Sequence, residues 1–360
     1  MTNPLRPLGA NLARAELRLG SGHAGLWYDK FFNQWNNAWQ IENKLLWIET
    51  VTRNPLGDKP LLDEAAARLM RFSEAQGGKS GIFVAASRFV TGLGRSHPVE
   101  NGFAWHPTLG MPYLPGSSIK GMVHAWAKNW AQPRLPDPQL DEIFGGPGQV
   151  GRVILLDALP IKPVQLAADI ITPHCANWTQ ADPPGDWCSP TPIPFLVMER
   201  GNSFVFAITP AWAGAVEILE PAWQWLTDAL QFLGGGAKTS VGYGRFELDQ
   251  MATDAAVRQL REKDTARRSE TDRQEKLKTP EGRWALELSG KSESDILELV
   301  RVHLENKPLT DLVERRAFAK AVENTGLPAI WAKRGKRDLR TQVGEKKCKE
   351  RATLVRRVLA

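Results

Sequence analysis

The spacing of apolar positions changes character twice along the chain. In residues 1–80 apolar side chains such as Trp27 and Phe31 recur at helical spacing, which predicts a mostly helical segment. From residue 81 the pattern alternates between strands and helices, and beyond residue 250 charged residues dominate. We therefore expect a helical N-terminal segment over 1–80, a mixed domain over 81–250, and a charged linker with a helical C-terminal extension over 251–360.

The central part predicts elements in the order strand, helix, strand, strand, helix, strand. This is the order of the split βαβ or ferredoxin-like pattern, an architecture also found in RRM-type RNA-recognition modules. Long insertions over 91–113 and 162–200 decorate it. The expected fold class is thus α+β, with a ferredoxin-like (RRM-like) domain. Its strands are expected over 81–90, 151–161, 203–209 and 242–248, and its helices over 117–130 and 221–233.

The second insertion, 162–200, is rich in proline and carries Trp178 and Trp187. Proline limits backbone freedom, so we expect this segment to protrude in an ordered form without a supporting sheet. Large flat side chains are typical of partner contacts. The alternative is that both tryptophans fold back onto the protein's own core, because Trp is highly buried on average. We predict that Trp178 and Trp187 contact a partner.

A Gly-rich segment, Gly234–Phe246, lies between the second predicted helix and the last predicted strand. Glycines let a backbone adopt positive φ and approach a ligand closely, and free N–H groups beside cations suit a phosphate. The alternative is a turn that only reverses the chain. The residues expected to bind the phosphate are Gly235, Gly236, Lys238, Thr239 and Arg245.

A second anion-suited element, Leu114–Gly121, opens the first predicted helix. Ser117 or Ser118 is expected to cap this helix, and with Lys120 and the free N–H groups they would form a phosphate site. The alternative is an ordinary capped surface helix. A basic stripe follows at helical spacing on Lys120, His124 and Lys128. The buried face is expected to comprise Ile119, Met122 or Val123, Trp126 and Trp130.

Net charge is unevenly distributed along the chain. The whole chain carries +6, yet residues 251–360 hold 26 Lys and Arg against 18 Asp and Glu, and residues 331–360 hold 11 against 3. A basic run of this kind suggests a polyanionic partner, although a solvated helix face gives the same pattern. Whether this extension binds RNA, DNA or protein stays open at this point.

Composition indicates a soluble globular protein, with 42% apolar and 24% charged residues among 360. No apolar run is long enough to span a membrane, and the N-terminus lacks an apolar signal core. Cys175, Cys188 and Cys348 form no disulfide framework, so they are expected to be reduced thiols. We expect a cytoplasmic protein without membrane contact.

The chain carries no convincing catalytic, metal or cofactor motif. Gly146–Gly151 matches G-x-G-x-x-G, but it precedes a strand instead of opening a helix, which argues against a dinucleotide. His174 and Cys175 with Cys188 have no standard zinc-ligand spacing. Histidines in loops such as those of His97 and His106 more often make structural or phosphate contacts than act as bases. We expect no cofactor, no metal and no catalysis.

Several segments together resemble the RAMP superfamily of type III CRISPR effector complexes, and within the type III-B (Cmr) complexes the sixth-subunit family. The resemblance runs from about residue 20 to residue 250 and says nothing about residues 251–360. The segments that carry it are 23–30, 87–94, 97–103, 114–121, 144–146, 185–190, 192–195 and 234–246.

The resemblance implies a non-catalytic RNA-binding backbone subunit in antiviral defence. It would bind the guide (crRNA) near its 3′ end, meet single-stranded target RNA, and stack on other RAMP subunits of the complex. Two alternatives stay open: a guide-processing endoribonuclease with His23, His97 or His106 as base, and a purely protein-bridging subunit. The residues expected to bind RNA are His23, Lys30, Arg88, Arg95, Ser117, Ser118, Lys120, Gly235, Gly236, Lys238, Thr239 and Arg245.

Overall fold

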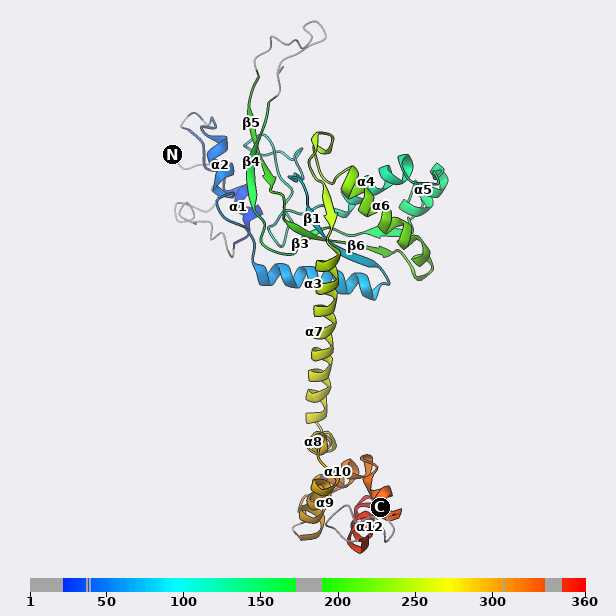
Figure 1. Ribbon diagram of the computed structural model, residues 1–360. Coiled ribbons are helices and arrows are strands. Elements are labelled where there is room, and N and C mark those ends of the chain that lie inside the picture. The colour runs from blue at the N-terminus through cyan, green and yellow to red at the C-terminus, as the bar shows by residue number, and fades with distance from the viewer. Residues whose placement is uncertain (1–21, 37, 39, 173–189, 307, 334–344) are drawn as a thin grey trace. The chain divides into compact units, whose positions relative to one another are not determined.

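A computed structural model describes residues 22–36, 38, 40–172, 190–306, 308–333 and 345–360 (Figure 1). The chain forms two compact units, residues 1–260 and residues 261–360. The first has a mixed α+β architecture and the second is helical. The division at residue 260 lies within a helix, so the three-part division by composition stays a prediction.

The sheet of the first unit is antiparallel throughout, with the strand order β2-β6-β1-β7 and with β3 also paired to β6. Helix α4 lies in sequence between β1 and β2, and α6 between β6 and β7. The bounds are Lys79–Ala85 for β1, Val153–Leu155 for β2, Leu159–Pro160 for β3, Ser203–Pro210 for β6, Phe246–Leu248 for β7, Gly116–Asn129 for α4 and Leu219–Phe232 for α6.

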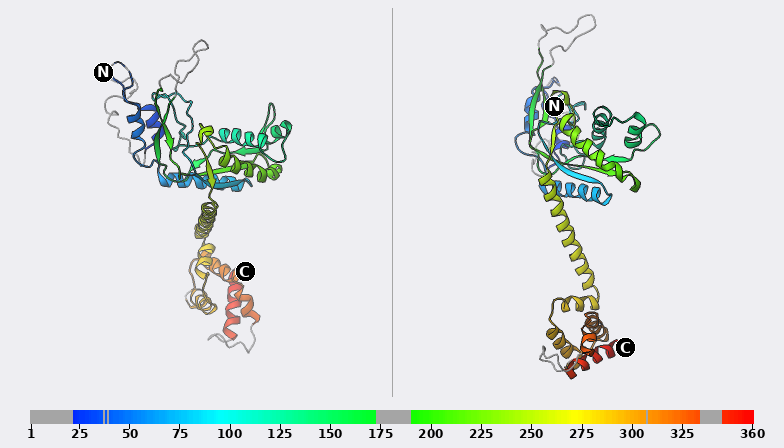
Figure 2. Two further views of the ribbon diagram at one scale, coloured as in Figure 1. Left: turned by 45° about the horizontal axis from the view of Figure 1, so that its top comes forward. Right: turned by 45° about the vertical axis from the view of Figure 1, so that its right-hand side comes forward.

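Both faces of this sheet are covered by helices (Figure 2). Successive side chains of a strand point to opposite faces. In β6, Phe204 and Phe206 belong to the core shared with α4 and α6, whereas Val205 packs with Ala66 and Met70 of α3 (Lys59–Ala75). Every residue of β6 is buried, as expected for a strand covered on both sides. An open sheet face for stacking RNA bases is therefore absent at the centre of this described sheet.

The N-terminal helices share the core of the sheet. Helices α1 (Ala24–Lys30) and α2 (Lys44–Thr50) contribute Tyr28 and Trp47 to the cluster that also contains Phe83 of β1. Asn43 caps α2 through a hydrogen bond from Leu46 N–H, and Asp58 caps α3 in the same way from Leu61 N–H. Helix α5 (Asp137–Phe144) and the 3₁₀ turn η2 (Ala213–Ile218) complete the unit.

The long insertion has a sheet at its base. Strands β4 (Leu166–Ile171) and β5 (Ile193–Met198) pair antiparallel in a second, two-stranded sheet. Both strands belong to the insertion, so the described arms of this segment pair with each other as a hairpin. Trp178 and Trp187, like Cys175 and Cys188, lie outside the described residues.

For α4 the expected buried face is correct at Ile119 and Val123 and wrong at Trp130. The structure buries Ile119, Val123 and Ala127, one helical turn apart each, while Trp130 is 50% exposed. Apolar content alone did not show that Trp126 and Trp130 stack on each other instead, with ring centroids 5.6 Å apart. Strand β1 ends earlier than expected because the chain leaves the main sheet and bridges Phe89 to Met198 of β5.

The second unit is a helical bundle with its own core. Ser292 caps α9 through a capping box, and Asp311 caps α10 by accepting from Val313 N–H. The charged stretch at the start of this extension, expected as a linker, forms the helix α7. The bounds are Gln250–Leu277 for α7, Pro280–Leu288 for α8, Glu293–Val300 for α9, Arg301–Asn306 for η4, Leu312–Asn324 for α10, Leu327–Lys333 for α11 and Glu345–Leu359 for α12.

The core of this unit centres on Phe318, Trp331 and Val355, which are fully buried. The helices that form this core, α8 to α12, are short, so packing of their apolar faces supplies most of their stability. Within the described part of the chain, no helix combines the length and the apolarity that a membrane crossing requires.

Candidate nucleic-acid interface around the Gly-rich loop

The Gly-rich loop, residues 234–246, folds back on the segment that follows β1. Gly244 N–H donates to the Arg88 carbonyl at 2.7 Å, and Ala237 N–H donates to the Val90 carbonyl at 2.8 Å. Gly235 N–H closes the loop on the Gly244 carbonyl at 2.8 Å. These main-chain bonds fix the loop to residues 86–91.

Close backbone contact explains the glycines of this loop. A Cβ atom on Gly244 would lie 1.9 Å from the Gly235 carbonyl oxygen, and one on Gly236 would lie 2.2 Å from the Val90 carbonyl oxygen. Both glycines also have positive φ, +77° and +87°. A Cβ on Gly235 would meet the Leu114 side chain at 2.7 Å. The structure thus brings together the two anion-suited elements, because Leu114 leads directly into α4.

Lys238 stands at the turn of the loop in a left-handed conformation, with φ +58°. It precedes the 3₁₀ turn η3 (Thr239–Val241), and its Nζ lies 5.8 Å from the centroid of the Phe195 ring. Among the described residues no carboxylate pairs with Lys238. The aromatic face orients this cation without neutralising it.

Arg88, by contrast, is bound to carboxylates of this protein. Its Nη1 lies 2.8 Å from Asp169 Oδ2 and its Nη2 lies 2.7 Å from Glu199 Oε1. The hydrogen bonds to Glu199 and Asp169 raise the pKa of Arg88 above its usual range. The Tyr243 hydroxyl also donates to Asp169 at 2.6 Å. Arg88 therefore ties the β4–β5 sheet to the Gly-rich loop.

The hydrogen bonds between Arg88, Asp169 and Tyr243 also shift the pKa values of Asp169 and Tyr243. Burial acts to raise the pKa of Asp169, but hydrogen bonds from Tyr243, the Ile170 N–H and Arg88 outweigh it and lower that pKa. Burial and the bond to Asp169 raise the pKa of Tyr243 to about 12. Asp169 is thus an anion and Tyr243 a neutral donor at neutral pH.

Arg245 is held by its main chain to the same segment. Its N–H donates to Ser87 Oγ at 3.0 Å, and its carbonyl accepts from Ala86 N–H at 2.8 Å. The side-chain Nη1 is buried and has no hydrogen-bond partner in the described structure. A buried charged donor without an acceptor is costly, so this nitrogen is suited to an incoming anionic oxygen.

The start of α4 differs from the expected serine cap. The N-cap residue is Pro115, and neither serine caps the helix. Instead the Asp157 carboxylate, from the turn between β2 and β3, accepts from Gly116 N–H at 2.6 Å. Asp157 thus already fills one position at this helix terminus. Ser117, Ser118 and Lys120 are left exposed beside it.

The remaining predicted RNA-binding residues form a separate group near Asp29. His23 caps α1, with Nδ1 accepting from Leu26 N–H at 2.9 Å, so its proton lies on Nε2, which donates to the Pro107 carbonyl at 2.7 Å. Lys30 and Arg95 are exposed. Burial raises the pKa of Asp29, and the charges of His97, Lys30, Arg95 and His23 oppose that rise.

The other two candidate bases also hold main-chain groups. His97 Nδ1 accepts from Val99 N–H at 3.2 Å and its Nε2 donates to the Tyr28 carbonyl at 3.0 Å. His106 Nδ1 accepts from Leu109 N–H at 3.3 Å. Burial lowers the pKa of both histidines. Their contacts are those of structural histidines.

Sequence reasoning missed four residues that shape this region: Asp157, Asp169, Glu199 and Tyr243. Asp169 and Glu199 lie far from Arg88 in the chain and meet it only because β4 and β5 pair. Tyr243 lies inside the predicted loop, where its hydroxyl could have been expected to seek a partner. In the described residues no cluster of His, Cys, Asp or Glu could hold a metal ion. His174, Cys175 and Cys188 lie outside those residues.

Residues 82–247 match the RAMP superfamily. The CRISPR system Cmr subunit Cmr6 of Pyrococcus furiosus is 28% identical to the chain over 276 residues, 59% of this chain and 80% of that protein. The CMR subunit Cmr6 of Saccharolobus solfataricus is 30% identical over 158 residues, 42% of this chain and half of that protein.

Solved structures give a weaker likeness. A chain in the cryo-EM structure of the type III-B Cmr-beta bound to cognate target RNA is 25% identical, with a TM-score of 0.48, over 57% of this chain and 71% of that chain. The crystal structure of Cmr6 from Pyrococcus furiosus is 26% identical, with a TM-score of 0.34, over 48% of this chain and 97% of that chain.

Proposed function

We propose that this chain, a RAMP superfamily protein homologous to the Cmr6 subunits of type III-B CRISPR complexes, is a non-catalytic RNA-binding backbone subunit of such a complex. It binds the guide RNA near its 3′ end and helps to assemble the particle that cleaves target RNA. The observation that carries the proposal is the sequence relationship to Cmr6 over 59% of the chain. The strand order β2-β6-β1-β7 supports a ferredoxin-like assignment for its core.

Because helices cover both faces of the central sheet, RNA contact falls to loops and helix ends. The Gly-rich loop offers Lys238, which no described carboxylate neutralises, and the buried unpartnered Nη1 of Arg245. Thr239 and the backbone at Gly235 and Gly236 complete this contact. In this proposal Arg88 fixes the loop, and its charge is already balanced by Asp169 and Glu199.

The α4 start supplies a second phosphate contact through Ser117, Ser118 and Lys120. Asp157 beside it restricts the position of the phosphate, because two anions at one helix terminus repel. A contact of this kind fixes RNA position without reading sequence. Lys120→Glu should therefore weaken binding to all RNA sequences alike. A loss confined to one sequence would indicate base readout and contradict this assignment.

His23, Lys30 and Arg95 form a third, peripheral contact on the N-terminal side. His23 acts there by holding the start of α1, since both ring nitrogens bond to the main chain, and Lys30 and Arg95 supply the charge. Lys30→Ala and Arg95→Ala should each lower RNA affinity modestly. His23→Ala should act mainly through stability, which thermal unfolding would measure.

The histidine contacts favour the binding role over a guide-processing endoribonuclease. A general base needs a free nitrogen, and His23 and His97 use both of theirs on main-chain groups. Purified protein incubated with labelled repeat RNA without metal should leave the RNA intact. Assembled complexes with His23→Ala, His97→Ala or His106→Ala should still cleave target RNA. Loss of cleavage in an assembled variant would restore the enzymatic alternative.

Trp178 and Trp187 are proposed to contact a neighbouring RAMP subunit. Deleting residues 176–188 should leave the free protein folded and weaken its incorporation into the complex. If the deletion unfolds the free protein, these tryptophans belong to its core and the docking role fails.

Reconstitution tests the whole proposal. The chain is combined with the other Cmr subunits and guide RNA, and native mass spectrometry and RNA crosslinking follow. We expect one particle containing this chain, with crosslinks from the guide to residues 234–246. Incorporation without any RNA crosslink would favour the purely protein-bridging alternative.

A further inference from the structure

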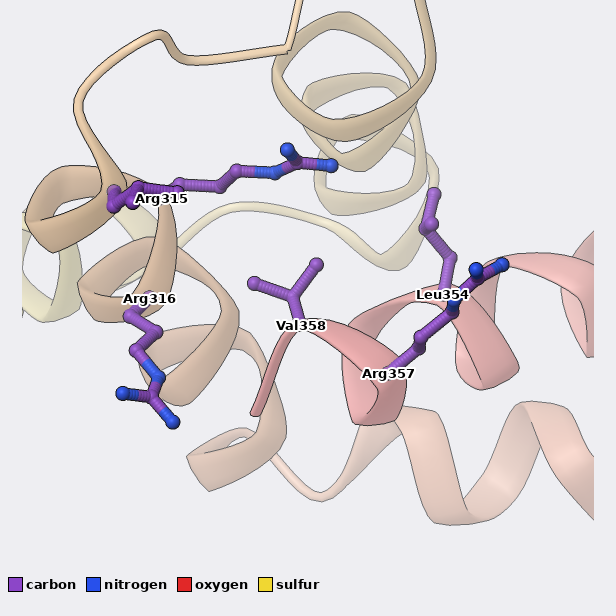
Figure 3. A pocket seen from close by; sticks show the side chains of 6 residues that line it. Arg315, Arg316, Leu354, Arg357 and Val358 are labelled. Atoms are coloured by element: carbon purple, nitrogen blue, oxygen red, sulfur yellow. The ribbon is translucent and has the colours of Figure 1, made fainter. Parts of the chain in front are cut away.

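The second unit contains a pocket of about 470 Å³ between α10 and α12, and its lining residues lie outside the sequence range 82–247 that matches the RAMP superfamily (Figure 3). Each helix contributes three residues spaced i, i+3 and i+4, which places them on one helix face. Its lining contains three arginines and three aliphatic residues and no carboxylate. These are Leu312, Arg315 and Arg316 of α10 and Leu354, Arg357 and Val358 of α12.

The pocket arginines lack the carboxylate partners that other arginines of this unit have. Glu314, Glu298, Glu305 and Glu323 pair with Arg283, Arg301, Arg351 and Arg356, respectively. In the described part of the chain none pairs with the three pocket arginines. Arg315 Nε is moreover buried without a hydrogen-bond acceptor. An acidic group entering the pocket would supply that acceptor.

The aliphatic half of the lining distinguishes a protein partner from a nucleic-acid partner. Leu354 and Val358 rise between Arg315 and Arg357 in Figure 3, so the guanidinium groups surround an apolar centre instead of converging on one point. Leu312 at the rim is 74% exposed, and its neighbour Val313 is 64% exposed. A phosphate backbone would leave this apolar surface in water, and the lining holds no aromatic ring for stacking a base. Aliphatic anchors ringed by Arg are typical of protein interfaces.

We propose that this pocket binds an acidic amphipathic segment of a partner protein. An aliphatic side chain of that segment packs between Leu312, Leu354 and Val358, while flanking carboxylates pair with the three arginines. The proposal does not depend on RNA binding by the first unit, because it rests on different residues.

Fluorescence anisotropy with the full chain tests the proposal. The probe is a labelled helical peptide of about 16 residues, long enough to form a helix, with leucine on one face and flanking glutamates. The same peptide with glutamine in place of every glutamate, and an oligouridine of matched length, are the comparison probes. We expect the acidic peptide to bind more tightly than the glutamine peptide, with affinity falling as salt rises.

Two surface variants locate the binding. Arg357→Glu should weaken the acidic peptide about tenfold or more, as loss of an anchoring charge does, and Leu312→Ser about fivefold through lost apolar burial. Lys320→Glu changes the same charge on the exposed side of α10, and Ile330→Ser removes an exposed aliphatic side chain elsewhere in this unit. Neither control residue lines the pocket, so both should leave affinity within about twofold.

Equal affinity for the acidic and glutamine peptides would overturn the proposal, as would insensitivity to Arg357→Glu and Leu312→Ser. Oligouridine binding that falls with Arg357→Glu but not with Leu312→Ser, without acidic peptide binding, would assign the pocket to nucleic acid instead. Circular dichroism of each variant verifies that the fold is retained.

Discussion

Arg88 in the first unit and the pocket arginines in the second carry the same charge in very different settings. Arg88 makes ion pairs through both terminal nitrogens, with Asp169 and Glu199, and ties the β4–β5 sheet to the Gly-rich loop. Arg315, Arg316 and Arg357 face a partly apolar pocket that contains no carboxylate. A cation is available to an outside anion only where its own fold has not already neutralised it. The net charge of each region therefore locates basic segments, but it does not show which cations are free to bind an anion from outside the protein.

Within the first unit, Lys238 differs from Arg88 in the same way. Residues 1–250 carry more acidic than basic residues, yet Lys238 contacts an aromatic ring instead of a carboxylate. It lies in the same loop that contacts the Arg88 main chain. Two neighbouring cations thus have different settings: Arg88 is paired with carboxylates, and Lys238 lies over an aromatic ring.

The largest expected effect comes from breaking the loop that holds this arrangement. Gly244→Ala should lower the free energy of unfolding by about 2–4 kcal/mol, because its Cβ would overlap the Gly235 carbonyl and its φ is positive. Gly242→Ala is the matched control, since it has φ +98° but nothing within 4 Å of its Cβ, and should cost about 1 kcal/mol. Urea denaturation measures both. Equal losses would mean that backbone conformation, not close approach, explains the glycines.

Removing the Arg88 charge should have the next largest effect. Arg88→Met leaves Asp169 and Glu199 without a cation and should cost about 1–2 kcal/mol, less than a fully buried pair because the Arg88 side chain is 41% exposed. Arg68→Met is the control, because Arg68 faces Glu64 at 3.8 Å on an exposed helix and should cost less than about 0.5 kcal/mol. Similar losses in both would show that Arg88 is an ordinary surface cation.

Acid should weaken the same network. The folded state lowers the pKa of Asp169, so its ionised form contributes stability above the ordinary aspartate pKa of about 4, and that contribution is lost as pH falls through the folded value. The difference in unfolding free energy between the wild type and Asp169→Asn should therefore shrink between about pH 6 and about pH 3. Denaturant unfolding over this range measures it. A difference that stays constant with pH would remove Asp169 from the linkage.

Local patterns predicted the elements better than the contacts between them. The α6 and β6 regions, the capping box at Ser292 and the N-cap at Asp311 all follow from periodicity and capping chemistry. The cap of α4 did not, because Asp157 reaches Gly116 from 41 residues away. The partners of Arg88 were missed for the same reason, since strand pairing alone brings them near. The sequence also did not show that α3 covers one face of the sheet. In the chain, α3 precedes the strands on which it packs.

In the proposed interface, Lys238 and not Arg88 offers its charge to RNA. The direct measurement is guide RNA affinity of the assembled complex as a function of salt for Lys238→Ala and Arg88→Met. We predict that Lys238→Ala lowers the slope of log affinity against log salt by about 0.7, the value for one phosphate contact on a single strand, whereas Arg88→Met leaves the slope unchanged. An unchanged slope for Lys238→Ala, or a larger decrease for Arg88→Met, would show that Lys238 is not the residue that contacts the RNA backbone.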